Sequence, residues 1–139
     1  MNLMDNAFIV KYPIIKNNSG NIHKLMDLNH HPNHLKGEMY ISQIKFNEIK
    51  AWMMHTKFES IFVIVAGLVK VKCLNIRGEI ILNKDLSLEN GSYFKIPPNT
   101  WYGFQGLSKN DSSILVLLDN LHNDNEVKKM PIKLSSWVK

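Results

Sequence analysis

The sequence predicts an all-β fold, either a sandwich or a closed barrel. Short apolar runs recur along its 139 residues, and Gly, Asn, Asp and Pro separate them at close intervals. No segment carries the long 3.6-residue apolar repeat of an amphipathic helix. Many short strands at close spacing are typical of small β-sandwiches and barrels. We therefore expect a single domain over residues 1–139.

The first half of the chain contains two predicted strands. Residues 8–12 (FIVKY) are a short apolar run that is followed by a proline. Residues 16–21 (KNNSGN) have the composition of a turn. Residues 39–46 (MYISQIKF) alternate in part, which places Tyr40 and Ser42 on one face of a strand.

The second half carries the strongest β signal, FVIVAGLVKVKC at residues 62–73. The Ala66-Gly67 pair in its middle predicts a tight turn or a bulge. Residues 76–82 predict a further hairpin that turns near Gly78. The remaining predicted elements are strands at 92–96 (SYFKI) and 113–118 (SILVLL), and one helical turn within 121–130.

Composition excludes several classes of function. The chain is 45% hydrophobic, as a folded globular domain is, and its formal charge of +5 comes from dispersed lysines. The charge pattern predicts no nucleic-acid stripe and agrees with a mildly basic pocket for an anionic small molecule. Cys73 is the single cysteine, so no internal disulfide forms, and we expect a buried, inert thiol.

The N-terminus, MNLMDNAFIVKYP, lacks the basic and apolar blocks of a signal peptide. No apolar run approaches the roughly 20 residues that cross a bilayer. We therefore expect a soluble, cytoplasmic protein that binds no membrane.

Histidines gather in one segment, residues 23–37 (HKLMDLNHHPNHLKG). Histidine is the commonest transition-metal ligand, but the spacing here matches no familiar zinc pattern and has no Cys partner. We therefore predict a polar, solvent-facing loop. The segment holds His23, His30, His31 and His34.

Two stretches, KAWMMHTKFESIFVIVAG at 50–67 and GSYFKIPPNTWYGF at 91–104, resemble the paired motifs of the cupin superfamily. The resemblance implies a double-stranded β-helix, or jelly-roll barrel. Its core would span about 37–127, with an N-terminal strand before it and a short C-terminal tail after it.

The cupin metal ligands are only partly retained. The resemblance places His55 and Glu59 at two usual ligand positions, whereas Met53 and Tyr102 occupy the other two. A divalent transition ion needs three or four converging N, O or S donors, and thioether and phenol are poor substitutes. We therefore predict no bound metal in this site and no cofactor.

One branch of cupins is more similar: the RmlC-like dTDP-4-dehydrorhamnose 3,5-epimerases and their shorter relatives from surface-polysaccharide gene clusters. IPPNTWYGFQGLS at 96–108 is the most distinctive stretch, and the similarity covers most of 37–127. The resemblance implies metal-independent proton transfer on a nucleotide-linked 4-keto-6-deoxyhexose in polysaccharide or deoxysugar biosynthesis, by a homodimer. The family's base and acid fall at Met53 and Val116, so its standard epimerase mechanism is not expected here.

A polar set remains near the expected barrel mouth. His55 is the candidate base, Tyr102 the candidate acid or oxyanion donor, and Glu59 the group that would orient His55. Lys50 would pair with a diphosphate, and tryptophans would stack on a base or sugar. The predicted substrate-binding residues are Lys50, Glu59, Tyr40, Ser42, Trp52 and Trp101.

Each of these residues also has a purely structural interpretation, such as a buried histidine, a surface acid, a solvated lysine or a core tryptophan. The sequence therefore leaves three functions open. The chain is an isomerase or epimerase, a non-catalytic cupin that binds a sugar nucleotide or assists a biosynthetic partner, or a structural β-domain.

Overall fold

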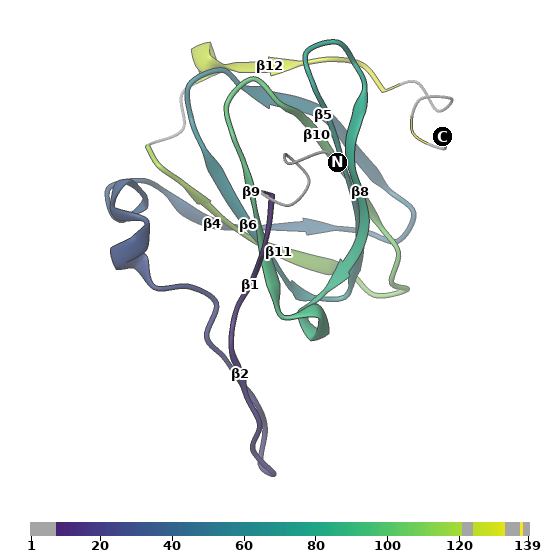
Figure 1. Cartoon of the computed structure of the whole chain (residues 1–139). Coiled ribbons are helices and arrows are strands. Elements are labelled where there is room, and N and C mark those ends of the chain that lie inside the picture. The colour runs from purple at the N-terminus through teal and green to yellow at the C-terminus, as the bar shows by residue number, and fades with distance from the viewer. Residues whose placement is uncertain (1–7, 121–123, 133–136, 138–139) are drawn as a thin grey trace.

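The computed structural model describes residues 8–120, 124–132 and 137, and strands dominate this part of the chain (Figure 1). The elements are β1 (Ile9–Lys11), β2 (Ile14–Ile15), β3 (Ile22–His23), η1 (Leu28–His30), η2 (Pro32–Leu35), β4 (Met39–Ile44), β5 (Ile49–His55), β6 (Ser60–Ala66), β7 (Leu68–Leu74), β8 (Ile80–Ser87), η3 (Leu88–Asn90), β9 (Ser92–Ile96), β10 (Trp101–Gly106), β11 (Ser112–Leu118), η4 (Asp124–Glu126) and β12 (Val127–Lys129). The four η elements are short 3₁₀ helices. The predicted all-β fold is confirmed.

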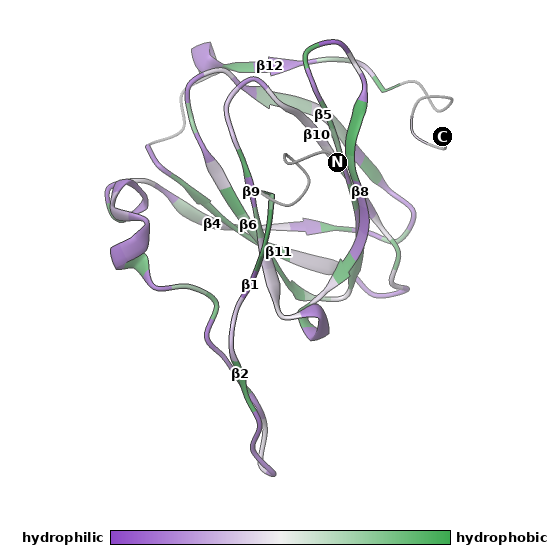
Figure 2. Cartoon of the chain, in the orientation of Figure 1, coloured by the Kyte–Doolittle hydropathy of each residue, from purple (hydrophilic) through white to green (hydrophobic). Residues whose placement is uncertain are grey.

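Two five-stranded antiparallel sheets form the barrel. The first has the strand order β1-β9-β6-β11-β4, and the second has the order β12-β5-β10-β7-β8. The short pair β2 and β3 is a separate hairpin that projects from the barrel (Figure 1). Its tip is hydrophilic (Figure 2), as the predicted turn at 16–21 requires.

Side chains alternate along the strands, so each sheet has an inner and an outer face. The barrel interior is apolar and holds Phe8, Ile44, Phe62, Ile64, Val69, Val71, Cys73, Leu82, Leu86, Phe94, Ile96, Tyr102, Phe104, Ile114, Val116 and Leu118. The outer face of the first sheet carries a second cluster of Tyr12, Ile61, Val63, Tyr93 and Leu117. The outer face of the second sheet carries a third, made by Trp52, Leu74 and Trp137.

Two predicted turns are confirmed, and glycine explains both. Gly67 has φ +83° and separates β6 from β7, and a Cβ there would lie 2.2 Å from the Ser112 hydroxyl oxygen. Gly78 has φ +82° and lies in the turn between β7 and β8. Only glycine adopts these left-handed conformations without steric cost.

The structure corrects the prediction for the histidine-rich segment. It contains η1 and η2, and the side chains of His31 and His34 are each only 9% exposed. The solvent-facing loop was therefore a wrong prediction for these two residues, although His30 is exposed. In the described ranges, no helix is long and apolar enough to span a membrane.

Candidate functional site

His55 is the last residue of β5 and lies inside the barrel. Alternation along β5 turns Met53 and His55 toward the interior and Trp52 toward the outside. The His55 side chain is only 4% exposed. Its ring stacks on Phe58 and on Tyr102, with centroid separations of 6.0 Å in each pair. A histidine this deeply buried needs polar partners for both ring nitrogens.

Tyr102 supplies one of these partners from the neighbouring strand β10. Its Cα lies opposite Met53 in the β5–β10 pairing. The phenol oxygen is 3.2 Å from His55 Nε2, and the two rings are nearly parallel, at 17°. The structure therefore brings together the two residues that the sequence predicted as base and acid.

Glu126 supplies the second partner from η4, just before β12 pairs with β5. Its carboxylate forms a short hydrogen bond with His55 Nδ1 and accepts a second, at 3.3 Å, from the Lys57 backbone N–H. Its backbone carbonyl accepts bonds from the Thr56 N–H at 2.9 Å and the Thr56 hydroxyl at 2.8 Å. Glu126 is 3% exposed, so this carboxylate is both buried and fixed in place.

The protons in this triad have a defined order. Because a carboxylate only accepts, Nδ1 of a neutral His55 carries the proton and Nε2 offers its lone pair. Burial raises the pKa of the Tyr102 phenol, and Tyr40, Glu126 and Cys73 raise it further. Tyr102 therefore stays protonated at neutral pH and donates to Nε2. The interior holds a carboxylate, an imidazole and a phenol in one hydrogen-bonded chain.

Three predicted substrate-binding residues lie together near the edge strand β4. Tyr40 and Ser42 share a face of β4 with buried Ile44. The Lys50 ammonium donates to the Gln43 carbonyl at 2.6 Å and to the Ser42 hydroxyl at 3.3 Å. Tyr40 is 37% exposed and close enough to Tyr102 to influence the Tyr102 pKa. Burial, followed by Glu38, raises the pKa of Tyr40 itself.

A cavity of about 600 Å³ lies along β5 beside β12. Its polar groups come from Lys50 and Lys129, and Met53 contributes to its lining. Two lysines at one cavity favour an anionic ligand group. The other lining residues are Ile49, Ala51, Trp52, Met130 and Pro131.

Glu59 does not reach His55, which corrects the prediction that it orients the imidazole. Its carboxylate lies 3.9 Å from His34 Nε2, and its side chain is 35% exposed. The acidic partner of His55 is Glu126.

The two predicted tryptophans lie outside the barrel. The Trp52 indole is 1% exposed, and its ring centroid lies 5.3 Å from that of Trp137. Trp101 packs against the same cluster on the outer face of the second sheet. Neither indole faces the interior where His55 and Tyr102 meet; Trp52 is too buried to stack on a ligand, whereas the prediction for the partly buried Trp101 stays untested.

Apolar side chains fill the positions of the usual epimerase base and acid. Met53 packs against the interior cluster, and Val116 is 1% exposed within it. His55 belongs to no group of three converging His, Cys, Asp or Glu donors in the part of the chain that the structure describes. The donor set around His55 therefore suits proton transfer better than metal binding.

Sequence reasoning missed Glu126, the residue that fixes the His55 tautomer. It lies 71 residues from His55 and follows both cupin motifs. The only signal was its place at the end of LLDNLHNDNEV (117–127), a stretch with similarity to the epimerase branch.

Comparisons with known proteins agree with this architecture. A family model described as "FdtA: WxcM-like, C-terminal" matches residues 5–131. No curated protein sequence matches the chain.

Solved structures share the fold at low sequence identity. A dTDP sugar isomerase from Desulfovibrio desulfuricans has a TM-score of 0.78 at 21% identity, over 92% of this chain and 85% of that one. The epimerase RmlC from Legionella pneumophila, in complex with dTDP-4-keto-L-rhamnose, has a TM-score of 0.76 at 15% identity, over 92% and 74%. QdtA, a sugar 3,4-ketoisomerase from Thermoanaerobacterium thermosaccharolyticum in complex with TDP, has a TM-score of 0.70 at 14% identity, over 88% and 86%. These matches confirm the predicted RmlC-like cupin fold.

Proposed function

The chain belongs to the FdtA family (WxcM-like, C-terminal), and on that premise we propose that it is a metal-independent ketoisomerase of nucleotide-linked 4-keto-6-deoxyhexoses. The reaction would move the ketone from C4 to C3 of the sugar. Such a step belongs to deoxysugar or polysaccharide biosynthesis.

One observation carries the choice of isomerisation over epimerisation. The His55 Nε2 and Tyr102 hydroxyl groups are 3.2 Å apart with their rings stacked, so both meet a bound sugar from the same side. Epimerisation needs a base and an acid on opposite faces of the carbon. Shifting a ketone to the adjacent carbon needs one base that removes a proton from C3 and returns it to C4.

The triad performs this shift with no external oxidant. A sugar entering the site takes the Tyr102 hydrogen bond away from Nε2. His55 then removes the C3 proton, and the C–H electrons form the C3–C4 double bond of an enediol while Tyr102 protonates O4. The imidazolium returns its proton to C4, O3 gives its proton back to Tyr102, and the C3 ketone forms. Glu126 stabilises the imidazolium and holds its Nδ1 proton.

The remaining polar groups would bind and orient the substrate. The Lys50 ammonium is exposed and meets the diphosphate as a point charge. Tyr40 and Ser42 are placed to donate hydrogen bonds to sugar hydroxyls or to the developing enediol oxygen.

Turnover of dTDP-4-keto-6-deoxyglucose, followed by proton NMR, tests this function. The wild-type chain should form the 3-keto isomer, and His55→Asn should not. His30→Asn is the matched control, because His30 is exposed and lies in η1 rather than in the barrel. The proposal would be rejected if the wild-type chain formed no 3-keto isomer from intact dTDP-4-keto-6-deoxyglucose.

A non-catalytic cupin that binds a sugar nucleotide is the second candidate. The apolar residues Met53 and Val116 at the usual catalytic positions favour it. Saturable dTDP binding by calorimetry with no turnover and no solvent exchange of the sugar protons would select this function instead.

We also propose that the chain forms a homodimer. Strand β4 is an unpaired edge of the first sheet, and Met39 and Ile41 on it are 68% and 53% exposed. Exposed apolar edge strands are commonly covered by a second copy. Analytical ultracentrifugation should give twice the 16.1 kDa chain mass, and Ile41→Lys should shift the population toward monomer.

A further inference from the structure

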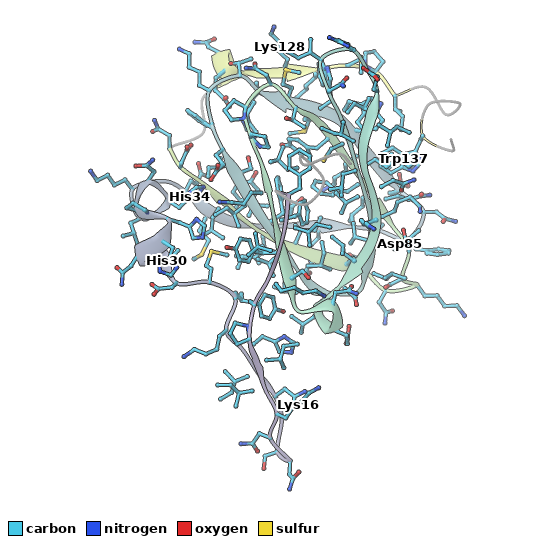
Figure 3. All side chains as sticks on the ribbon, viewed as in Figure 1. Lys16, His30, His34, Asp85, Lys128 and Trp137 are labelled. Carbon is cyan, nitrogen blue, oxygen red and sulfur yellow. The ribbon has the colours of Figure 1, made fainter. Side chains whose placement is uncertain are left out.

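A cluster of two histidines lies outside the barrel, on the outer face of the first sheet. His31 is the residue before η2, and His34 lies within η2. A 3₁₀ helix has about 3.0 residues per turn, so a spacing of three places both imidazoles on one side. Figure 3 shows His34 on the short helical turns, across the barrel from Trp137.

Glu59 completes this cluster from the loop that precedes β6. One ligand atom each from His31, His34 and Glu59 lies within 4.8 Å of the other two. Glu59 Oε1 is 3.9 Å from His34 Nε2, too far for a hydrogen bond. Donors bound tetrahedrally to one zinc ion at 2.0–2.1 Å lie about 3.3–3.4 Å apart. Rotamer adjustments of under about 1.5 Å would bring these three atoms onto one ion.

The surroundings keep the imidazoles available as ligands. His31 and His34 are each 9% exposed as residues, so the chain already holds them in place, and the 35% exposed Glu59 side chain leaves an open approach.

We propose that His31, His34 and Glu59 bind one divalent transition ion, Zn²⁺ by the chemistry of the donors. Two imidazoles and one carboxylate are a ligand set that zinc uses, with water in the fourth position. The ion would tie the η1–η2 segment to the start of β6, and it takes no part in the chemistry at His55.

Two existing contacts and one nearby positive charge oppose metal binding at this cluster. His34 Nε2 lies 3.3 Å from the Glu59 backbone oxygen, so that contact must give way to the metal. The Tyr93 hydroxyl must likewise release His31 Nε2. Lys95 repels any cation at this place. These costs predict micromolar rather than picomolar affinity, which calorimetry measures directly.

Zinc titration of the untagged full-length chain by isothermal calorimetry tests the site. We expect one ion per chain, and Glu59→Gln and His34→Ala should each weaken binding by at least about 100-fold, more than loss of an outer-shell contact does. Zinc should also raise the melting temperature of the wild type but not of Glu59→Gln. Since the Glu59 carboxylate is partly exposed, this variant keeps the fold even if His34→Ala does not.

His30→Ala is the matched control, because this neighbouring histidine lies outside the three-donor group. It should bind zinc with wild-type affinity. The proposal is overturned if the wild type binds no zinc at micromolar concentration. It is also overturned if Glu59→Gln binds as tightly as the wild type, or if His30→Ala weakens binding as much as His34→Ala does.

Discussion

Two histidine–glutamate pairs lie on opposite sides of the barrel wall: His55 with Glu126 inside, and His34 with Glu59 outside. They differ in burial and in the distance between the imidazole nitrogen and the carboxylate oxygen. Inside the barrel, His55 and Glu126 are 4% and 3% exposed and share a direct hydrogen bond. On the outer face, His34 is buried, Glu59 is 35% exposed, and their ligand atoms stand 3.9 Å apart. Both pairs join the segment at 55–60 to elements distant in sequence.

The difference shows how geometry selects the chemistry of one pair of residue types. A direct carboxylate contact fixes the proton on Nδ1, so the other nitrogen becomes a base with a defined direction. In the separated pair the carboxylate does not hold the imidazole directly, so an ion can lie between them once His34 Nε2 releases the Glu59 backbone oxygen. We therefore propose proton transfer for the inner pair and metal binding for the outer pair.

The largest expected effect comes from removing the inner imidazole. His55→Asn should lower kcat by at least about 10³-fold, because His55 is the proposed base for the C3 proton. The same variant should bind zinc as the wild type does, since the outer donors are untouched. If His55→Asn lost both turnover and zinc binding while keeping a native circular dichroism spectrum, the two regions would not be functionally separate.

Removing the charge of the inner carboxylate should have the next largest effect. In Glu126→Gln, the amide can donate to Nδ1 and so favours the tautomer whose Nε2 carries the proton and cannot act as base. We expect kcat to fall about 10²-fold. Glu48→Gln, at an exposed position, is the control. An unchanged kcat in Glu126→Gln would reduce Glu126 to a packing role.

A smaller effect is expected at the barrel mouth. Lys50→Met should raise KM about tenfold, or about 1.4 kcal/mol of binding free energy, and should change kcat less. Lys50→Arg should restore most of the affinity, because it keeps the charge. A loss confined to kcat would place Lys50 at the reacting carbon instead of at the diphosphate.

The smallest effect concerns stability at alkaline pH. The folded pKa of Tyr102 is raised, so above the ordinary tyrosine pKa of about 10 the unfolded chain loses a proton that the folded chain keeps. The stability contribution is fully present below about pH 10 and is lost as pH rises beyond it, at no more than about 1.4 kcal/mol per pH unit. Tyr102→Phe should flatten this decline in chemical denaturation, and Tyr12, Tyr40 and Tyr93 should sustain part of it. An identical slope in both proteins would contradict the assignment.

Local features of the fold were predictable because their causes are local. Gly67 and Gly78 take left-handed conformations that few other residues tolerate, so the turns were visible in the sequence. The burial of the histidine-rich segment could not be predicted from the sequence. It depends on contacts of His31 with Tyr93, 62 residues away, and of His34 with Glu59, 25 residues away. Contacts of that range leave no local pattern.

The site was predictable only in part. The two cupin motifs identified His55 and Tyr102, whose side chains meet across adjacent strands. Glu126 depends on the pairing of β12 with β5, which neither motif records. The tryptophans could have been placed correctly, since the alternation that turns Met53 and His55 inward turns Trp52 outward.

We propose that His55 and Tyr102 act on the sugar from one side. Turnover of dTDP-4-keto-6-deoxyglucose in D₂O, with NMR assignment of every ring proton, tests this directly. We expect a 3-keto product in which deuterium enters at C4, or the C3 proton is carried there, while C5 keeps its proton and configuration. Inversion at C5 would contradict this result, because inversion requires a second group on the opposite face.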